Sequence, residues 1–165
     1  MYCGAYCLQF VARRDGLRLS RRRAAALGGT TRNGTRPDGM VGALLALGYR
    51  RARLRERLKW HELRRLAKNK RAVIIVSWWS DLDAGDRYPK ALPADGHWSV
   101  VTQITADAIT LYDPDAPQPR TLPRIFFEAR WYDYDIAPDG ARYDLQRAAV
   151  VAYAPVKHAK RAAAG

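Results

Sequence analysis

Cysteine is scarce in this sequence: the 165 residues include only two, Cys3 and Cys7. They lie four residues apart on what reads as one helix, where the Cα–Cα separation and the Cβ directions do not suit a disulfide bond. We therefore expect two free thiols, which fit a reducing compartment. The scarcity argues against a fold stabilised by disulfide bonds.

Long hydrophobic runs are also lacking. The longest runs from Ala72 to Trp79 and reads as a buried strand, whereas crossing a bilayer takes about 20 apolar residues. No basic segment followed by an apolar one precedes the domain, so a secretory leader is not expected. These two absences predict a cytoplasmic protein without a membrane segment.

Acidic residues are few compared with basic ones: 16 Asp and Glu stand against 29 Lys and Arg, for a net charge of +13. A basic surface can indicate a nucleic acid or another polyanion as partner. The arginines are, however, spread along the chain and interleaved with apolar positions instead of gathering on one helix face. We therefore favour an ordinary solvated surface and do not expect nucleic acid as a partner.

Length and composition predict one globular domain. The chain is long enough to bury a sizeable core, 48% of its residues are hydrophobic, and no internal repeat interrupts it. We expect the domain to span residues 1–155 and residues 156–165 to form a basic, Ala-rich flexible tail.

Hydrophobic periodicity predicts an α+β fold, with helices first and a mostly antiparallel sheet second. Ser20 is the expected N-cap of the second helix, and Pro37 suits the first turn of the third. Helices are expected over residues 4–14, 21–27, 37–48, 60–69 and 124–131. Strands are expected over residues 49–55, 72–78, 97–105, 108–112 and 148–153.

Three residues have the chemistry of a thiol nucleophile system. Cys3 stands where the first helix begins, and a helix N-terminus stabilises a thiolate. His97 opens a strand after a glycine, and Asp113 ends the strand paired with it. Because a short turn brings the far ends of a hairpin together, we expect Asp113 to orient His97 and His97 to hold Cys3 as the thiolate.

Each residue type also has a simpler explanation. Cys7 reads as core filler, and His61 and His158 have no partner pattern. Asp113 or Asp115 could merely start a turn. Cys3, Cys7 and His97 could hold a metal, but their spacing matches no standard zinc pattern, so we expect neither a metal nor a cofactor.

The sequence resembles the bacteriocin-processing cysteine peptidases, which cut after double-glycine leaders, and their papain-like relatives. The resemblance rests on Cys3–Leu8, Gly34–Gly48, Gly96–Val101, Leu111–Pro114, and Phe127 with Trp131. It implies a papain-like fold and a soluble, stand-alone peptidase that hydrolyses a peptide or isopeptide bond of a peptide or protein substrate. It also implies that Cys3 is the nucleophile of a thioester acyl-enzyme, His97 the general base and acid, and Asp113 the orienting residue.

The sequence departs from this family at one point: members carry an oxyanion glutamine shortly before the nucleophile, and only Met1 and Tyr2 precede Cys3. Gln9 lies on the wrong side to replace it. Three alternatives therefore stay open, namely a weakened or inactive peptide-binding domain, a Cys-His-Asp acyltransferase and a polyanion-binding protein. The acidic segment 81–95 could favour a basic peptide, or it could be a solvated loop.

Overall fold

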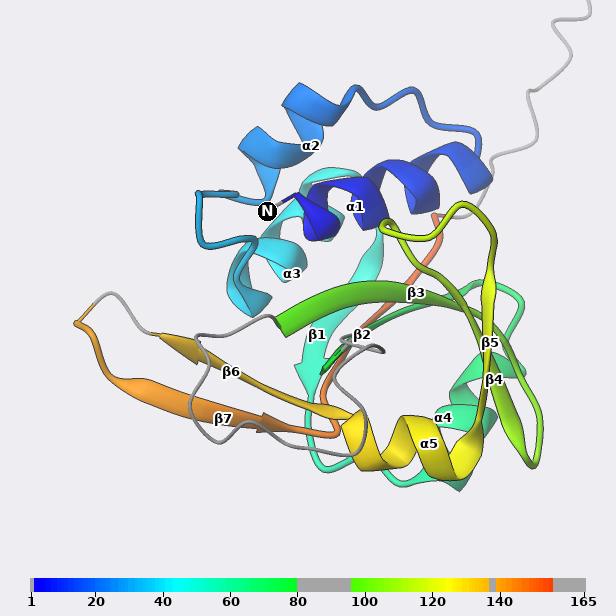
Figure 1. Ribbon diagram of the computed structural model, residues 1–165. Helices are drawn as coiled ribbons and strands as arrows, with labels where there is room; N and C mark the ends of the chain where they lie inside the picture. Colours follow the sequence, from blue (N-terminus) through cyan, green and yellow to red (C-terminus); the bar gives the residue numbers. More distant parts are fainter. Residues whose placement is uncertain (1, 80–95, 137–138, 156–165) are drawn as a thin grey trace, which may run out of the picture.

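The computed structural model describes residues 2–79, 96–136 and 139–155. Helices and strands follow the predicted order, helices first and sheet second, as Figure 1 shows. The helices are α1 (Cys3–Arg14), α2 (Arg21–Leu27), α3 (Pro37–Ala46), α4 (Trp60–Ala67) and α5 (Arg124–Arg130). The strands are β1 (Arg50–Arg55), β2 (Ala72–Trp79), β3 (Gly96–Ile104), β4 (Ala108–Tyr112), β5 (Arg120–Pro123), β6 (Tyr132–Ile136), β7 (Arg142–Gln146) and β8 (Ala149–Tyr153).

The main sheet has six strands in the order β1-β8-β2-β3-β4-β5, and every neighbouring pair is antiparallel. Strands β6 and β7 form a separate antiparallel hairpin. The predicted α+β class with a mostly antiparallel sheet is therefore confirmed.

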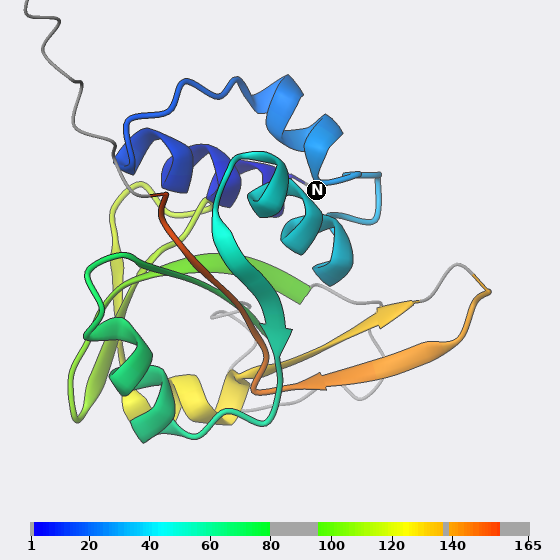
Figure 2. The ribbon, with the colours of Figure 1, turned by 180° about the vertical axis from the view of Figure 1, so that it is seen from behind.

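Helices cover both faces of the main sheet. Figures 1 and 2 show α1, α2 and α3 on one side of it and α4 and α5 on the other. The buried apolar run in β2 is explained by this layering, because successive side chains of a strand point to opposite faces. Val73 and Ile75 pack in the core beneath α1–α3, whereas Ile74, Val76 and Trp78 pack in the core beside α4 and α5.

Helix α1 carries the first candidate residue and is fixed by its apolar face. Leu8, Val11 and Ala12 recur at helical spacing and are fully buried against the sheet. The helix is followed by Gly16 at φ +81°, a left-handed conformation that glycine adopts without strain. Ser20 then caps α2 as predicted, its Oγ accepting a hydrogen bond from the backbone N–H of Arg23 at 3.2 Å.

The sequence prediction locates all five helices but misses three strands, β5, β6 and β7. Three helices are shorter than expected, since α3 ends at Ala46, α4 at Ala67 and α5 at Arg130. The expected acidic loop 81–95 and the expected tail 156–165 lie outside the described residues. Among the described helices, none has the length and apolar character needed to cross a membrane.

Candidate active site

Cys3 is the first residue of α1 and is buried, only 3% exposed. The helix begins without a side-chain cap, and its first turn contains no acidic residue. Gly4 allows this turn to approach the loop before α3, because a Cβ at Gly4 would lie 2.5 Å from Thr35 Oγ1. The glycine after the cysteine therefore serves close packing against Thr35.

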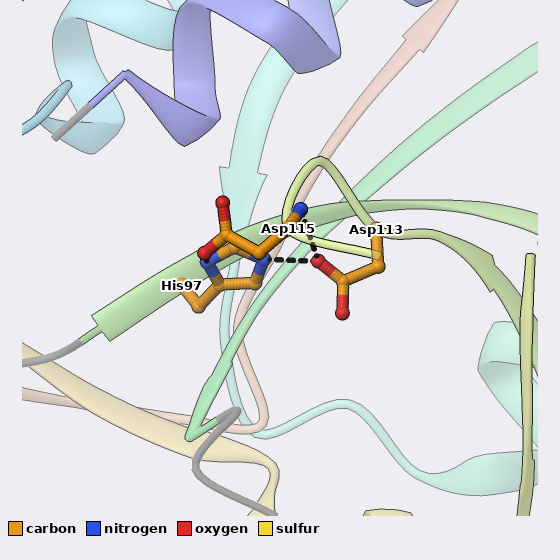
Figure 3. A group of neighbouring side chains, drawn as sticks. All are labelled: His97, Asp113 and Asp115. Carbon is orange, nitrogen blue, oxygen red and sulfur yellow. Dashed lines mark hydrogen bonds and ion pairs between the residues drawn. The ribbon is translucent and has the colours of Figure 1, made fainter. Parts of the chain in front are cut away.

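His97 and Asp113 lie at adjacent ends of the β3–β4 hairpin. His97 is the second residue of β3, Asp113 directly follows β4, and each is only 1% exposed. His97 Nε2 lies 2.7 Å from Asp113 Oδ1 in a buried hydrogen bond, which Figure 3 shows. The structure thus brings together the two side chains that the hairpin argument paired.

Asp113 has further partners that fix its carboxylate. Its Oδ1 accepts a hydrogen bond from the backbone N–H of Asp115 at 3.0 Å. Arg120 on β5 places Nε 2.9 Å from Oδ2, in an ion pair whose angles are not those of a hydrogen bond. A strand that sequence reasoning missed therefore supplies a cation behind the histidine–aspartate pair.

Neighbouring groups shift the ionisation of both buried residues. Burial alone would lower the pKa of His97, but hydrogen bonds and charge interactions with Asp113 and Cys3 outweigh it and raise this pKa to about 9. Burial would raise the pKa of Asp113, but His97, the Asp115 backbone and Arg120 together hold it below its usual value. His97 is therefore an imidazolium near neutral pH, held against the Asp113 carboxylate.

Asp115 is a site residue that sequence reasoning treated only as a turn former. Its Oδ2 lies 3.6 Å from His97 Nδ1, and its side chain is 65% exposed. Tyr112 pairs with Val100, so continuing both strands by three residues places Asp115 opposite His97. The hairpin register was the signal that could have found it. Figure 3 shows the two carboxylates on different sides of the imidazole ring.

His97, Asp113 and Asp115 are also the one group in the described part of the chain whose potential metal-ligand atoms lie close together. The atoms are already paired: Asp113 Oδ1 serves both His97 Nε2 and the Asp115 backbone. These hydrogen bonds orient the imidazole ring of His97. The group does not include Cys3 or Cys7, which the sequence analysis considered as metal ligands together with His97.

Cys7 connects α1 to the strand of the histidine. Its Sγ donates to the backbone carbonyl of Trp98 at 3.1 Å, and burial raises the pKa of its thiol well above the usual range. Trp98 in turn donates from Nε1 to the carbonyl of Thr35 at 2.8 Å. Cys7 is a core residue, as predicted, and it fixes the distance between α1 and β3.

A small cleft of about 50 Å³ opens beside Cys3. Its walls come from the loop before α3, from the start of β3 and from the β6–β7 hairpin. Asp133 on β6 lies in this wall, 9% exposed, and accepts a short hydrogen bond from Ser77 Oγ. Burial raises the pKa of Asp133 to about 6. The carboxylate occupies the space where a side chain at Gly96 would be, which sequence reasoning did not foresee.

A search of solved structures finds a similar fold in the peptidase domain of Streptococcus ComA, a bi-functional ABC transporter involved in a quorum-sensing pathway. The similarity covers 88% of this chain and 91% of that domain, with a TM-score of 0.59 and 21% sequence identity. The chain has a papain-like peptidase fold. No protein-family model and no curated protein sequence matches it. The comparison confirms the predicted fold, and the roles of Cys3, His97 and Asp113 remain predictions.

Proposed function

We propose that the protein is a cysteine peptidase that hydrolyses a peptide or isopeptide bond through Cys3, His97 and Asp113. The observation that carries the proposal is the buried imidazole of His97, which is hydrogen-bonded to the Asp113 carboxylate and whose pKa is raised by interactions with Asp113 and Cys3. A papain-like peptidase fold around these residues supports the same conclusion.

In the proposed mechanism the proton of the Cys3 thiol already lies on His97 before the substrate binds, and Asp113 stabilises this imidazolium. The thiolate attacks the substrate carbonyl carbon, and His97 gives its proton to the leaving amine as the C–N bond breaks. A water molecule, deprotonated by His97, then attacks the thioester. The carboxylic acid leaves and the thiol is restored.

The first turn of α1 supplies oxyanion donors in this mechanism. The first intrahelical bond runs from Tyr6 N–H to Tyr2 carbonyl at 3.0 Å, so the preceding amides of Cys3, Gly4 and Ala5 have no acceptor within the helix. Removing one oxyanion donor lowers turnover by roughly 100- to 1,000-fold in other enzymes. We therefore expect the free backbone N–H groups at the start of α1 to provide part of the oxyanion stabilisation.

The small cleft supports a substrate with small residues next to the scissile bond. The cleft is small, which favours small substrate residues and agrees with the double-glycine cleavage of the family that the sequence resembles. Glycines at Gly34 and Gly96 line this cleft. We propose a peptide or protein that presents Gly-Gly or Gly-Ala to Cys3.

The test is hydrolysis of peptides of the form X-Gly-Gly-Y, followed by mass spectrometry of the products. Wild type and Cys7→Ser, which keeps a donor for the Trp98 carbonyl, should cleave after the glycine pair, whereas Cys3→Ala and His97→Ala should lose at least about 100-fold in rate. Product transferred to an added amine in preference to water would instead indicate an acyltransferase. Peptide binding without turnover or Cys3-dependent labelling would indicate an inactive relative.

A further inference from the structure

We propose that the protein has a second site, which binds the phosphodiester backbone of nucleic acid through a basic strip on the surface. The basic strip consists of two hollows, of about 320 and 400 Å³, which share Asn69. The cationic side chains that line it are Arg14, Arg50, Arg51, Arg64, Lys68, Lys70 and Arg71. This site is independent of the proposed peptidase chemistry.

The fold gathers the arginines of the first hollow from distant parts of the sequence. Tyr153 at the end of β8 pairs with Arg50 on one side and with Ala72 on the other. Arg71 immediately precedes Ala72, so Arg50 and Arg71 flank the same tyrosine. Sequence reasoning saw dispersed arginines because this grouping depends on the order of strands in the sheet.

Arg51 is placed in the hollow by an irregular backbone. The β1–β8 register shifts between Arg50 and Arg53, and Arg51 has φ +55°, a left-handed conformation that non-glycine residues rarely adopt. A bulge of this kind re-aims a side chain. The edge strand thus directs a second exposed arginine to the hollow beside Arg50.

The second hollow continues the positive charge. Arg14 comes from the end of α1, Arg64 from α4, and Lys68 and Lys70 from the turn after α4. No Asp or Glu is among the described residues that line either hollow. Arg14 pairs with Asp15, but the six other lining cations have no ion-pair partner in residues 2–79, 96–136 and 139–155.

An extended phosphate backbone fits this surface better than a single small anion. Two hollows that share Asn69 present seven cations between them, as positively charged grooves for a nucleic-acid backbone do, and the net charge of +13 adds long-range attraction. Arg14 and Cys3 lie at opposite ends of α1, about 16.5 Å apart along the helix by the rise per residue. The basic strip therefore reaches α1 at the end away from Cys3.

The test is fluorescence anisotropy of the full chain with a labelled 20-base-pair DNA duplex and a 20-base single strand, at rising salt. Arg50→Gln/Arg51→Gln should weaken binding by roughly 10-fold at 0.1 M salt and lower the slope of log K against log salt by about 2. The matched control is Arg22→Gln/Arg23→Gln, which makes the same charge change on exposed residues of α2. The control should bind within about 2-fold of wild type.

Three outcomes would overturn the proposal. They are no binding by wild type at 0.1 M salt, equal losses in both double variants, and binding of phosphatidylserine vesicles without binding of either DNA. Equal losses would mean that only total charge matters, and vesicle binding would identify a lipid surface. Thermal melting shows that each variant is folded, and peptide cleavage by Arg50→Gln/Arg51→Gln should equal that of wild type.

Discussion

His97 lies between two carboxylates of different character, and the difference sets their expected roles. Asp113 is buried and held by a hydrogen bond and an ion pair, whereas Asp115 is mostly exposed at 3.6 Å from the ring. A buried charge acts on its neighbour much more strongly than one screened by water. Asp113 is therefore the group that holds the imidazolium.

Replacing Asp113 by asparagine should lower the pKa of His97 from about 9 toward its ordinary value, because the buried negative charge is lost. Peptide cleavage should fall by at least about 10-fold. Asp115→Asn, which removes the exposed charge, is the matched control and should change the rate by less than about 3-fold. NMR titration of the His97 ring checks the pKa, and an unchanged midpoint in Asp113→Asn would refute this assignment.

The raised pKa of His97 also predicts how stability changes with pH. A histidine whose pKa is higher when folded stabilises the protein fully below its unfolded value of about 6.5, and this contribution is lost as pH rises through about 9. Wild type should therefore lose about 1–3 kcal/mol of unfolding free energy between pH 7 and pH 10 that His97→Gln does not lose. Urea unfolding at both pH values measures the difference, and parallel losses would contradict it.

At the scale of elements, the β6–β7 hairpin is held against the sheet at the start of β3. Asp133 on β6 accepts from Ser77 on β2 and fills the space above Gly96, next to His97. Arg36 before α3 adds an ion pair with Asp135 at 3.5 Å, which ties the same hairpin to the helical layer. These contacts fix one wall of the cleft beside Cys3.

Gly96→Ala should destabilise the protein by about 1–3 kcal/mol, because the new Cβ would lie 2.0 Å from an oxygen of Asp133 and the hairpin must move. Peptide cleavage should fall as well, since the cleft wall is displaced. Gly42→Ala is the matched control: it is in α3 with open space around it and should stabilise by roughly 0.5–1 kcal/mol. Equal melting temperatures for the two variants would contradict the close contact at Gly96.

Local pattern explains which elements could be predicted from the sequence. The stripe of α1, the Ser20 cap and the apolar run of β2 are local signals, and all three elements were predicted. Strand β6 reads Tyr-Asp-Tyr-Asp-Ile, an alternation that fits a strand but was not recognised, and its buried residue is Asp133 instead of a member of the Tyr and Ile face. Its Asp133 is buried only because Ser77 meets it from 56 residues away, a contact that no local pattern contains.

The candidate site, like the secondary structure, was predictable only where it depends on residues close together in the sequence or in one hairpin. The pairing of His97 with Asp113 follows from hairpin geometry, which depends on two neighbouring strands and a short turn. The residues that surround these groups come from other elements and depend on the tertiary fold. They are Arg120, Asp133 and Thr35, which packs against Gly4. Sequence reasoning therefore found the proposed reacting groups but not the residues that contact them.

At the scale of the whole molecule, the sheet separates two hydrophobic cores. Cys3 belongs to the core beneath α1–α3, whereas Phe127 packs with Trp60, Trp78 and Trp131 in the core on the other face. Stability and reactivity should therefore be separable at Phe127, whose core contains neither Cys3 nor any other residue of α1 and meets the site through Trp78, which lies edge-on to His97.

Phe127→Ala should cost about 3–5 kcal/mol of unfolding free energy by opening a cavity among the aromatic rings. The fraction that stays folded should still cleave peptide at close to the wild-type rate. Ile125→Ala on the same helix, where the side chain is 82% exposed, should change stability by less than about 0.5 kcal/mol. Denaturant unfolding and activity at low temperature check both expectations. A fully folded Phe127→Ala variant without activity would contradict the claim that stability and reactivity are separable.

The most direct test of the account is the rate at which iodoacetamide alkylates Cys3 between pH 5 and pH 9, with the adduct located by tandem mass spectrometry. If His97 holds Cys3 as the thiolate, wild type should be alkylated at pH 6 at least about 10-fold faster than His97→Ala. Cys7, which is buried and hydrogen-bonded to Trp98, should stay unmodified in the folded protein. Equal rates for Cys3 in wild type and His97→Ala across this range would contradict the claim that Cys3 is an activated nucleophile.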